Sequence, residues 1–521
     1  MNIKTRVSQT RGIDISMKLA ERIKRVENGF HPILLDKNEL PFELTIQKLM
    51  QMYRVPGLSV AVIDNFKIAW AKGYGVTEAG TMTPVTTNTL FQAGSVSKPV
   101  AAVGALCLVE RRKLSLDEDV DKRLVSWKVP ENRFTRDERV TLRRILCHNA
   151  GLTVHGFNGY DIDESIPTLA QILNGEPPAN NLAIRVDSVP GTRWRYSGGG
   201  TTIAQQLMID VTGRPFPQLM HDMVLSKIRM DHSTFEQPLP ESRIAESASG
   251  TYADGEIVHG KWHVYPEMAA AGLWTTPSDL ARFAIEIALS RLGRSNRLLS
   301  EITTHEMLKP QVEHLEELAL GNDEHPDRMG LGFFLGDETR PDLFGHIGDD
   351  AGFMAMLIMY GNSGKGAALM TNSQVGMLVE DYLVQNIARE YEWNYVPSRR
   401  VHPEALTTLF LLAQRKGVAA AIEKHGEFKR TGSDLSVAGE NTLIFLAYSL
   451  VFEQKLQDAI KIMEYAVKEY PKYWNAYDTL GEIYLHSGDK VHAIENYEKS
   501  LKLNPDNQNG NVMLKKLKQQ D

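Results

Sequence analysis

At residues 91–99 the chain reads Phe91-Gln92-Ala93-Gly94-Ser95-Val96-Ser97-Lys98-Pro99, and this segment determines how the rest of the sequence is interpreted. Ser95 and Lys98 are three residues apart, so on a helix their side chains share one face. A serine hydroxyl is a poor nucleophile at its own pKa and needs a neighbouring base. The pair therefore predicts a nucleophilic serine that is served by a lysine amine. The Ala-rich apolar segment 100–111 predicts a buried helix, which would fix Ser95 at its exposed N-terminal end.

Two β-branched segments lie upstream of this pair, at residues 55–63 and 68–75, on either side of a polar turn. They predict a β-hairpin. Four further segments follow in order at residues 145–152, 190–198, 271–280 and 346–353, and two strand-like runs come after the last of them. Each segment falls where an acyl-transfer site built around a serine would need another part.

Taken together, the Ser-x-x-Lys pair, Tyr196-Ser197 after the Pro190-Gly191-Thr192 turn, and His346-Ile347-Gly348 followed by Gly352-Phe353 resemble one family in order and spacing. This family is the class C β-lactamases and penicillin-binding-protein-like serine hydrolases, with D-aminopeptidases, DD-peptidases and carboxylesterases among its members. The resemblance covers roughly residues 42–391. It implies an α+β fold in which helices flank an antiparallel sheet, with an all-helical lobe and the site in the cleft between them.

The resemblance assigns four parts of the chemistry to this chain. Ser95 would form the acyl-enzyme, and Lys98 would act as its base, which requires a lysine pKa lowered by burial or by neighbouring cations. Tyr196 would pass a proton to the leaving group, which requires nearby positive charge that favours the phenolate. The backbone NH groups of Ser95 and Asp349 would form the oxyanion hole, where one donor is worth about 100-fold or more in rate.

Two further positions of the His346 segment complete the expected site. His346 stands where many relatives carry the lysine of Lys-Thr-Gly, and a histidine there can donate a hydrogen bond and change charge near neutral pH. Gly348 would let a strand edge approach the substrate closely. His148, in the segment that resembles His-Thr-Ser-Gly-Leu, is interpreted as a structural residue that ties a loop.

One position departs from the family pattern. Relatives that act on β-lactams or peptidoglycan peptides usually carry Asn two residues after the tyrosine, where its amide contacts the substrate, whereas this chain has Gly198 followed by Gly199 and Gly200. The departure weakens the peptide and β-lactam interpretations and favours an esterase. We expect ester turnover to exceed β-lactam turnover, and Gly198→Asn to narrow the gap.

Composition agrees with a large enzyme of at least two domains, because 521 residues exceed what one core normally serves. The net charge of −7 gives no basic footprint for nucleic acid. Cys107 and Cys147 have no spacing typical of a disulfide framework or a zinc site. No nucleotide or metalloprotease motif occurs, so no cofactor and no metal are expected. Without a transmembrane run or a signal peptide, the chain as it stands is expected to be cytoplasmic, or exported if a signal was removed.

The chain changes character after Trp393. We predict an N-terminal helix or tail over residues 1–30, a hydrolase domain over 31–393, a polar, proline-bounded linker over 394–402 and a helical domain over 403–521. Within the last, residues recur at a spacing of 34, the tetratricopeptide period, which predicts repeats at 441–471 and 474–507. Two repeats are marginal alone, so the helical stretch 403–430 is expected to supply a third layer.

The sequence thus predicts a serine hydrolase that cleaves an amide or ester in a β-lactam-like, D-amino-acid peptide or small ester substrate through an acyl-enzyme. A carboxylesterase is the alternative within the enzyme class. The alternative from another class is a weakly catalytic penicillin-binding or scaffold protein that works through its repeats. Those repeats would bind a protein partner, mediate self-association or only pack on the hydrolase. We expect them to be separable, so that truncation near Ser398 leaves an active enzyme.

Overall fold

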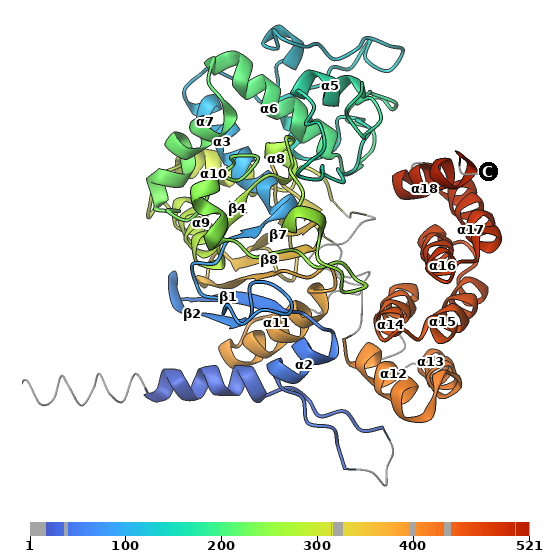
Figure 1. Cartoon of the computed structure of the whole chain (residues 1–521). Coiled ribbons are helices and arrows are strands. Elements are labelled where there is room, and N and C mark those ends of the chain that lie inside the picture. Colours follow the sequence, from blue (N-terminus) through green and yellow to red (C-terminus); the bar gives the residue numbers. More distant parts are fainter. Residues whose placement is uncertain are drawn as a thin grey trace, which may run out of the picture.

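The computed structural model describes residues 17–35, 40–313, 315, 327–395, 403–431, 439–505 and 507–519. Up to residue 395 these form an α+β body, and from residue 403 onward they form helices only. Figure 1 shows the helices of the C-terminal part as an arc beside the body. The expected class, an antiparallel sheet flanked by helices with a helical C-terminal domain, is confirmed.

A seven-stranded sheet forms the centre of the body, in the order β2-β1-β9-β8-β7-β6-β5, and every neighbouring pair is antiparallel. Its strands are β1 (Gly57–Asp64), β2 (Lys67–Gly75), β5 (Arg328–Met329), β6 (Phe334–Leu335), β7 (Leu343–Asp350), β8 (Phe353–Tyr360) and β9 (Lys365–Thr371). A separate pair is made by β3 (Phe91–Gln92) and β4 (Trp274–Thr275). The predicted hairpin is the β1–β2 pair.

Helices cover the sheet and form a lobe at one end of it, where Figure 1 shows α3, α5, α6 and α7 together. Every residue of β8 is buried, because α9 and α11 both pack on it. The helices of the body are a helix over residues 17–28, α2 (Ile46–Met52), α3 (Ser97–Glu110), α4 (Leu142–Leu146), α5 (Leu169–Asn174), α6 (Gly198–Thr212), α7 (Phe216–Met220), α8 (Met268–Ala271), α9 (Pro277–Arg291), α10 (Glu301–Met307) and α11 (Met377–Tyr391).

Short turns of tighter or wider helix connect these elements. They are η1 (Gly94–Val96), η2 (Val120–Lys122), η4 (Ser226–Ile228), η5 (Glu241–Glu246) and η6 (His259–Lys261) of the 3₁₀ type, and the π-helical turn η3 (His221–Leu225). Of these, η1 matters most for function, because it carries Ser95 directly into α3. The helix predicted over 100–111 therefore begins three residues earlier, at Ser97.

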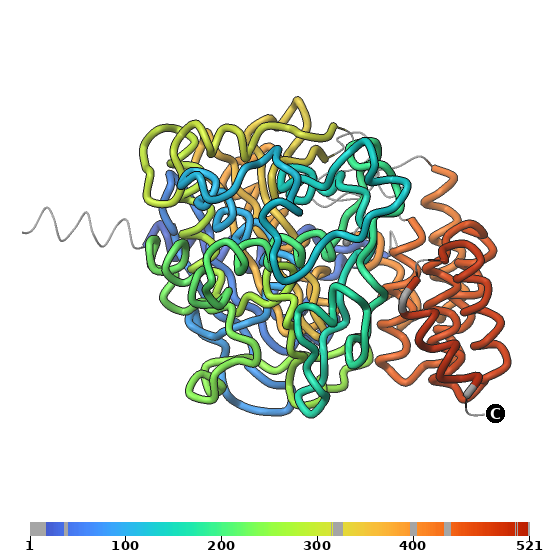
Figure 2. Tube along the Cα trace, turned by 90° about the horizontal axis from the view of Figure 1, so that it is seen from above, coloured from blue at the N-terminus to red at the C-terminus, as the bar shows by residue number. Residues whose placement is uncertain are grey.

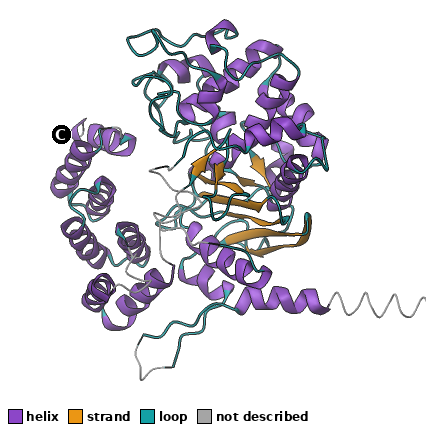
Figure 3. Ribbon diagram, turned by 180° about the vertical axis from the view of Figure 1, so that it is seen from behind, coloured by secondary structure: helices purple, strands orange, loops and turns teal. Residues whose placement is uncertain are grey.

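The C-terminal domain consists of helical hairpins stacked side by side, as the trace in Figure 2 and the ribbon in Figure 3 show. Its helices are α12 (Pro403–Lys416), α13 (Val418–Thr431), α14 (Glu440–Phe452), α15 (Leu456–Glu469), α16 (Trp474–His486), α17 (Lys490–Leu503) and α18 (Gln508–Gln519). The pairs α14–α15 and α16–α17 are the two predicted repeats. The expected third layer is the α12–α13 pair, which packs on α14 and α15.

Small residues allow the helices of the second repeat to cross closely. A Cβ built on Gly481 would lie 3.2 Å from the Ala493 carbonyl oxygen and 3.3 Å from the Tyr497 ring. Ala493 and Tyr497 are fully buried at this crossing.

The first helix of this domain is packed into the body rather than attached loosely to it. Leu406 and Leu409 of α12 are fully buried, and the Thr407 hydroxyl is hydrogen-bonded to the phenols of Tyr53 and Tyr382, which belong to the body. Most of the predicted linker, residues 396–402, lies outside the described residues. Removing the chain after Ser398 would thus expose an apolar surface of the body and leave the phenols of Tyr53 and Tyr382 without the Thr407 hydroxyl. The helical domain is therefore held to the body more firmly than a polar linker alone indicates.

Candidate active site

The predicted nucleophile and base are in direct contact. Lys98 Nζ lies 2.8 Å from Ser95 Oγ and donates a second hydrogen bond of 2.8 Å to the carbonyl oxygen of Ala270 in α8. The Lys98 side chain is almost fully buried, because α3 is surrounded by α6, α7 and α8. The two bonds hold the amine in one position beside the serine oxygen, where it can receive the hydroxyl proton.

Two glycines let the serine segment lie directly against strand β7. Gly94 has a left-handed backbone (φ +50°), and a Cβ built on it would lie 2.6 Å from the Asp349 nitrogen. A Cβ built on Gly348 would lie 2.0 Å from the Ala93 carbonyl oxygen and 3.1 Å from the Ser95 nitrogen. Only glycine fits at such a close approach. The backbone amides of Ser95 and Asp349, the predicted oxyanion donors, therefore belong to two segments in contact.

A buried carboxyl also holds the serine segment against strand β7. Asp350 Oδ2 accepts a hydrogen bond of 3.1 Å from the Gly94 nitrogen, and burial, reinforced by the neighbouring Asp349, raises the pKa of Asp350 well above its usual value. Sequence reasoning missed this residue. The sequence places Asp350 beside Asp349, but Gly94, to which it is hydrogen-bonded, lies 256 positions away in the chain.

Tyr196 lies at the centre of an aromatic group beside the lysine. Lys98 Nζ is 4.9 Å from the centroid of the Tyr196 ring, within the range of a cation–π contact. The rings of His148, His155, His346 and Phe334 surround the phenol, at centroid distances of 4.4, 4.9, 6.1 and 6.1 Å. The structure thus brings Ser95, Lys98 and Tyr196 together, as the motifs predicted.

His346, one of the rings around Tyr196, is buried in β7. Its Nδ1 lies 2.6 Å from the Ile347 carbonyl oxygen, which can only accept, so Nδ1 carries the proton and donates. Its ring also packs on Phe334 at a centroid distance of 5.0 Å. The hydrogen-bond donor expected at this position is therefore engaged with the backbone of its own strand at Nδ1.

His148 ties the loop before α6, which confirms its structural interpretation. Its Nδ1 accepts a hydrogen bond of 3.2 Å from the Ser197 nitrogen. Burial, together with the charge of Lys98, lowers the pKa of His148 well below its usual value, so the ring stays neutral and keeps this acceptor. Ser197 then caps α6 by accepting from the Gly200 nitrogen at 2.9 Å, which is the usual role of serine at a helix start.

The structure explains why glycine stands at position 198. The Gly198 nitrogen donates to the His155 carbonyl oxygen at 2.9 Å, and a Cβ at this position would lie 3.0 Å from that oxygen and 3.2 Å from the Phe157 ring. A side chain at this position would therefore need the loop to shift by a few tenths of an ångström. His155 itself is exposed, and sequence reasoning did not single it out.

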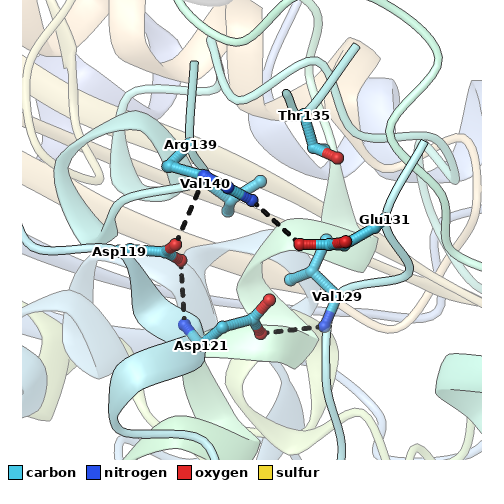
Figure 4. A pocket seen from close by; sticks show the side chains of 7 residues that line it. All are labelled: Asp119, Asp121, Val129, Glu131, Thr135, Arg139 and Val140. Carbon is cyan, nitrogen blue, oxygen red and sulfur yellow. Dashed lines mark hydrogen bonds and ion pairs between the residues drawn. The ribbon is translucent and has the colours of Figure 1, made fainter. Parts of the chain in front are cut away.

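No metal site competes with this assignment within the described ranges, where no group of three or more His, Cys, Asp or Glu residues is placed to hold an ion. A small pocket elsewhere is lined by Asp119, Asp121, Val129, Glu131, Thr135, Arg139 and Val140 (Figure 4). Its free space is about 10 Å³, room for about one water molecule. Arg139 pairs with two of its carboxylates, so the cluster has a structural role. Nor does any described helix have the length and apolarity to cross a membrane.

Comparisons with known proteins agree with this geometry. The family model described as Beta-lactamase matches residues 42–390, and a tetratricopeptide repeat model matches residues 474–507. An unguisins hydrolase of Aspergillus violaceofuscus is 26% identical over 253 residues, which are 44% of this chain and 41% of that protein. A β-lactamase of Pseudomonas fluorescens is 29% identical over 242 residues, 46% of this chain and 62% of that protein. The chain thus covers less than two thirds of the length of each of these two relatives.

Penicillin-binding protein 4 of Amycolatopsis lactamdurans is 26% identical over 333 residues, 62% of this chain and 82% of that protein. Among solved structures, the octameric penicillin-binding protein homologue from Pyrococcus abyssi has a TM-score of 0.55 at 21% identity, covering 67% of this chain and 76% of its own. D-alanine carboxypeptidase AmpC from Burkholderia cenocepacia has a TM-score of 0.52 at 19% identity, covering 72% and 99%. At such identities the structural likeness shows the fold alone. The family model, however, spans most of the chain, and the chain belongs to the beta-lactamase family, with a tetratricopeptide repeat near its C-terminus.

Proposed function

We propose that this protein is a serine hydrolase that works through an acyl-enzyme on Ser95. The observation that carries the proposal is the pair of 2.8 Å hydrogen bonds by which Lys98 Nζ joins Ser95 Oγ and the Ala270 carbonyl oxygen. A base in contact with a hydroxyl is what converts serine into a nucleophile. The membership of the beta-lactamase family, with a β-lactamase and a penicillin-binding protein among the relatives, supports the reaction class.

The proposed reaction uses each of these groups in turn. Ser95 Oγ attacks the substrate carbonyl carbon while Lys98 Nζ takes the hydroxyl proton. The amides of Ser95 and Asp349 donate to the oxygen on which negative charge develops. Tyr196, whose ring lies beside Lys98, gives its phenolic proton to the leaving oxygen or nitrogen as that atom's bond to the carbonyl carbon breaks, and it receives in return the proton held by Lys98. Water then attacks the acyl carbon and gives a proton to Lys98, and Ser95 Oγ takes that proton as its bond to the acyl carbon breaks and the acid leaves.

Among substrates, we propose small esters first and amides of the β-lactam or D-amino-acid type second. The glycine at position 198 supports this order, because it offers no side-chain amide to hold the amide group of a substrate. Turnover of a chromogenic short-chain ester, a β-lactam and a D-alanyl peptide, measured side by side, tests it. Penicillin hydrolysis far faster than ester hydrolysis would contradict the proposed preference.

A second candidate function is that of a weakly catalytic penicillin-binding protein that acts through its repeats. A hollow of about 660 Å³ between α13 and α15 favours it. Val418, Ile422 and Tyr465 give this hollow an apolar lining, and Asp458, Lys461, Glu464 and Lys468 line it with charge. Stable acylation of Ser95 without measurable turnover of any of the three substrates would favour this function over the first.

A further inference from the structure

A fully buried glutamate lies in the turn that supports the base, and the reaction described above does not use it. The turn runs from Tyr265 through α8 to Gly272 and carries the Ala270 carbonyl that accepts from Lys98. Gln205 of α6 bridges its backbone, donating to the Pro266 carbonyl oxygen at 3.1 Å and accepting from the Ala269 nitrogen at 2.8 Å. These two hydrogen bonds fix the backbone of the turn, and with it the Ala270 carbonyl that binds Lys98.

Glu267 starts this helical turn, and its side chain is fully buried. Its own carbonyl oxygen accepts from the nitrogens of Ala270 and Ala271 at 2.9 and 3.0 Å. Apart from the backbone nitrogen of Glu267 itself, which slightly favours the charged form, neither of its carboxyl oxygens has a hydrogen-bond partner in the described part of the chain. A buried carboxylate without partners is very costly, so the group is stable here only in its neutral form.

Burial is the cause that favours the neutral carboxyl of Glu267. The titratable groups that face it are the phenols of Tyr160 and Tyr265 and the carboxyl of Asp350. Lys98 reaches the same turn from α3, but its hydrogen bonds go to Ser95 and Ala270. Burial raises the pKa of Glu267 to about 8, so the carboxyl would ionise within an accessible alkaline range.

We propose that Glu267 is a positioning residue for Lys98: its neutral carboxyl packs within the α8 turn, and its ionisation opens that turn and withdraws the Ala270 carbonyl from the lysine. A new carboxylate in this place must reach water or a cation. The shortest route is movement of the turn that carries it. Lys98 then loses one of the two bonds that hold it beside Ser95, and acylation slows. The inference rests on the proposed function, because it acts through Lys98 as the base.

The test compares Glu267→Gln with wild type and with Glu380→Gln. Glu380 is an equally buried carboxyl on α11, whose pKa burial also raises well above its usual value, so it controls for the loss of any buried acid. The rate of Ser95 acylation by a chromogenic ester is measured from pH 6 to 10, after subtraction of the rate with Ser95→Ala. Wild type and Glu380→Gln should lose about tenfold in rate per pH unit above the transition, and Glu267→Gln should not.

An unchanged alkaline loss in Glu267→Gln, or its equal disappearance in Glu380→Gln, would overturn the inference. Glu267→Met, which is also uncharged, repeats the test if the glutamine variant does not fold. The proposed function fails in a different way, since wild type would then acylate at no pH. A loss of thermal stability without any change in the pH profile would assign Glu267 a merely structural role and reject the inference.

Discussion

Replacing Gly348 by alanine should disable the oxyanion hole while leaving the fold intact. The new Cβ would lie 2.0 Å from the Ala93 carbonyl oxygen, whereas non-bonded heavy atoms prefer about 3.5 Å. Strand β7 and the serine segment must therefore separate by about 1.5 Å. Because Asp349 moves with β7 and Ser95 moves with the other segment, the two amides can no longer donate to one oxygen. Loss of one such donor costs about 100- to 1000-fold in kcat.

The strain should cost about 1–3 kcal/mol of stability, as overpacked sites usually do. The assay is therefore kcat on a chromogenic ester together with thermal unfolding, to show that the inactive protein is folded. Gly156→Ala is the matched control, because a Cβ there would meet no atom within 4 Å, and it should retain near-normal kcat. A Gly348→Ala enzyme that is folded and within tenfold of wild type would refute the account of the oxyanion hole.

Three further variants test other parts of the structure. Thr407→Val removes the hydroxyl that is hydrogen-bonded to both Tyr53 and Tyr382, and it should lower the free energy of unfolding, measured in urea titrations, by about 2–5 kcal/mol. The control Thr408→Val loses only a hydrogen bond within its own helix and should cost far less. Equal costs would contradict the packing of α12 on the body. Gly198→Asn should slow acylation by both esters and β-lactams, because its Cβ meets His155 at 3.0 Å, and faster β-lactam acylation would show that the loop yields. The difference in unfolding free energy between Glu267→Gln and wild type should shift in favour of the variant as pH rises from about 4.5 to 8. The folded protein keeps the Glu267 proton up to a pKa of about 8, whereas the unfolded chain loses it near 4.5, so wild type loses up to about 5 kcal/mol of stability across that window. A difference in urea titrations that does not depend on pH would contradict this prediction.

The Gly198 prediction differs from the expectation drawn from the motif alone, and measured turnover of Gly198→Asn decides between the two. In the sequence, glycine at this position indicated a missing contact that asparagine could restore. In the structure, the carbonyl groups of Val154 and His155 accept from the nitrogens of Gly199 and Gly198, and a Cβ on Gly198 would lie 3.0 Å from the His155 carbonyl oxygen. No local sequence pattern predicts this packing, because the loop at Val154 and His155 lies more than 40 residues before the start of α6 at Gly198.

Features with local rules were predictable from the sequence. The Ser95–Lys98 contact follows from helical spacing, the β1–β2 hairpin from two β-branched runs around a turn, and the helical pairs of the repeats from their 34-residue period. Each depends on residues close in the chain or on one recurring unit. The order of the motifs then identified the family.

Features that depend on distant contacts were not predictable. Lys98 binds a carbonyl 172 positions away, and any residue can offer a backbone carbonyl, so the sequence gives no sign of it. Glu267 and Asp350 are acidic residues of a kind usually exposed, and only the fold shows that they are buried. Likewise, the hydroxyl of Thr407 becomes a link between domains only once α12 is packed on the body.

The most direct test of Ser95 as the nucleophile is intact-protein mass spectrometry after incubation with a fluorophosphonate and, in parallel, with a penicillin. If Ser95 is the nucleophile, each reagent should give one adduct per chain, located by peptide mapping on Ser95. Folded Ser95→Ala should give no adduct, and Lys98→Ala should be labelled much more slowly, because that variant lacks the group 2.8 Å from the serine oxygen. Labelling of Ser95→Ala at the wild-type rate, or an adduct mapped to another residue, would contradict this assignment of the nucleophile.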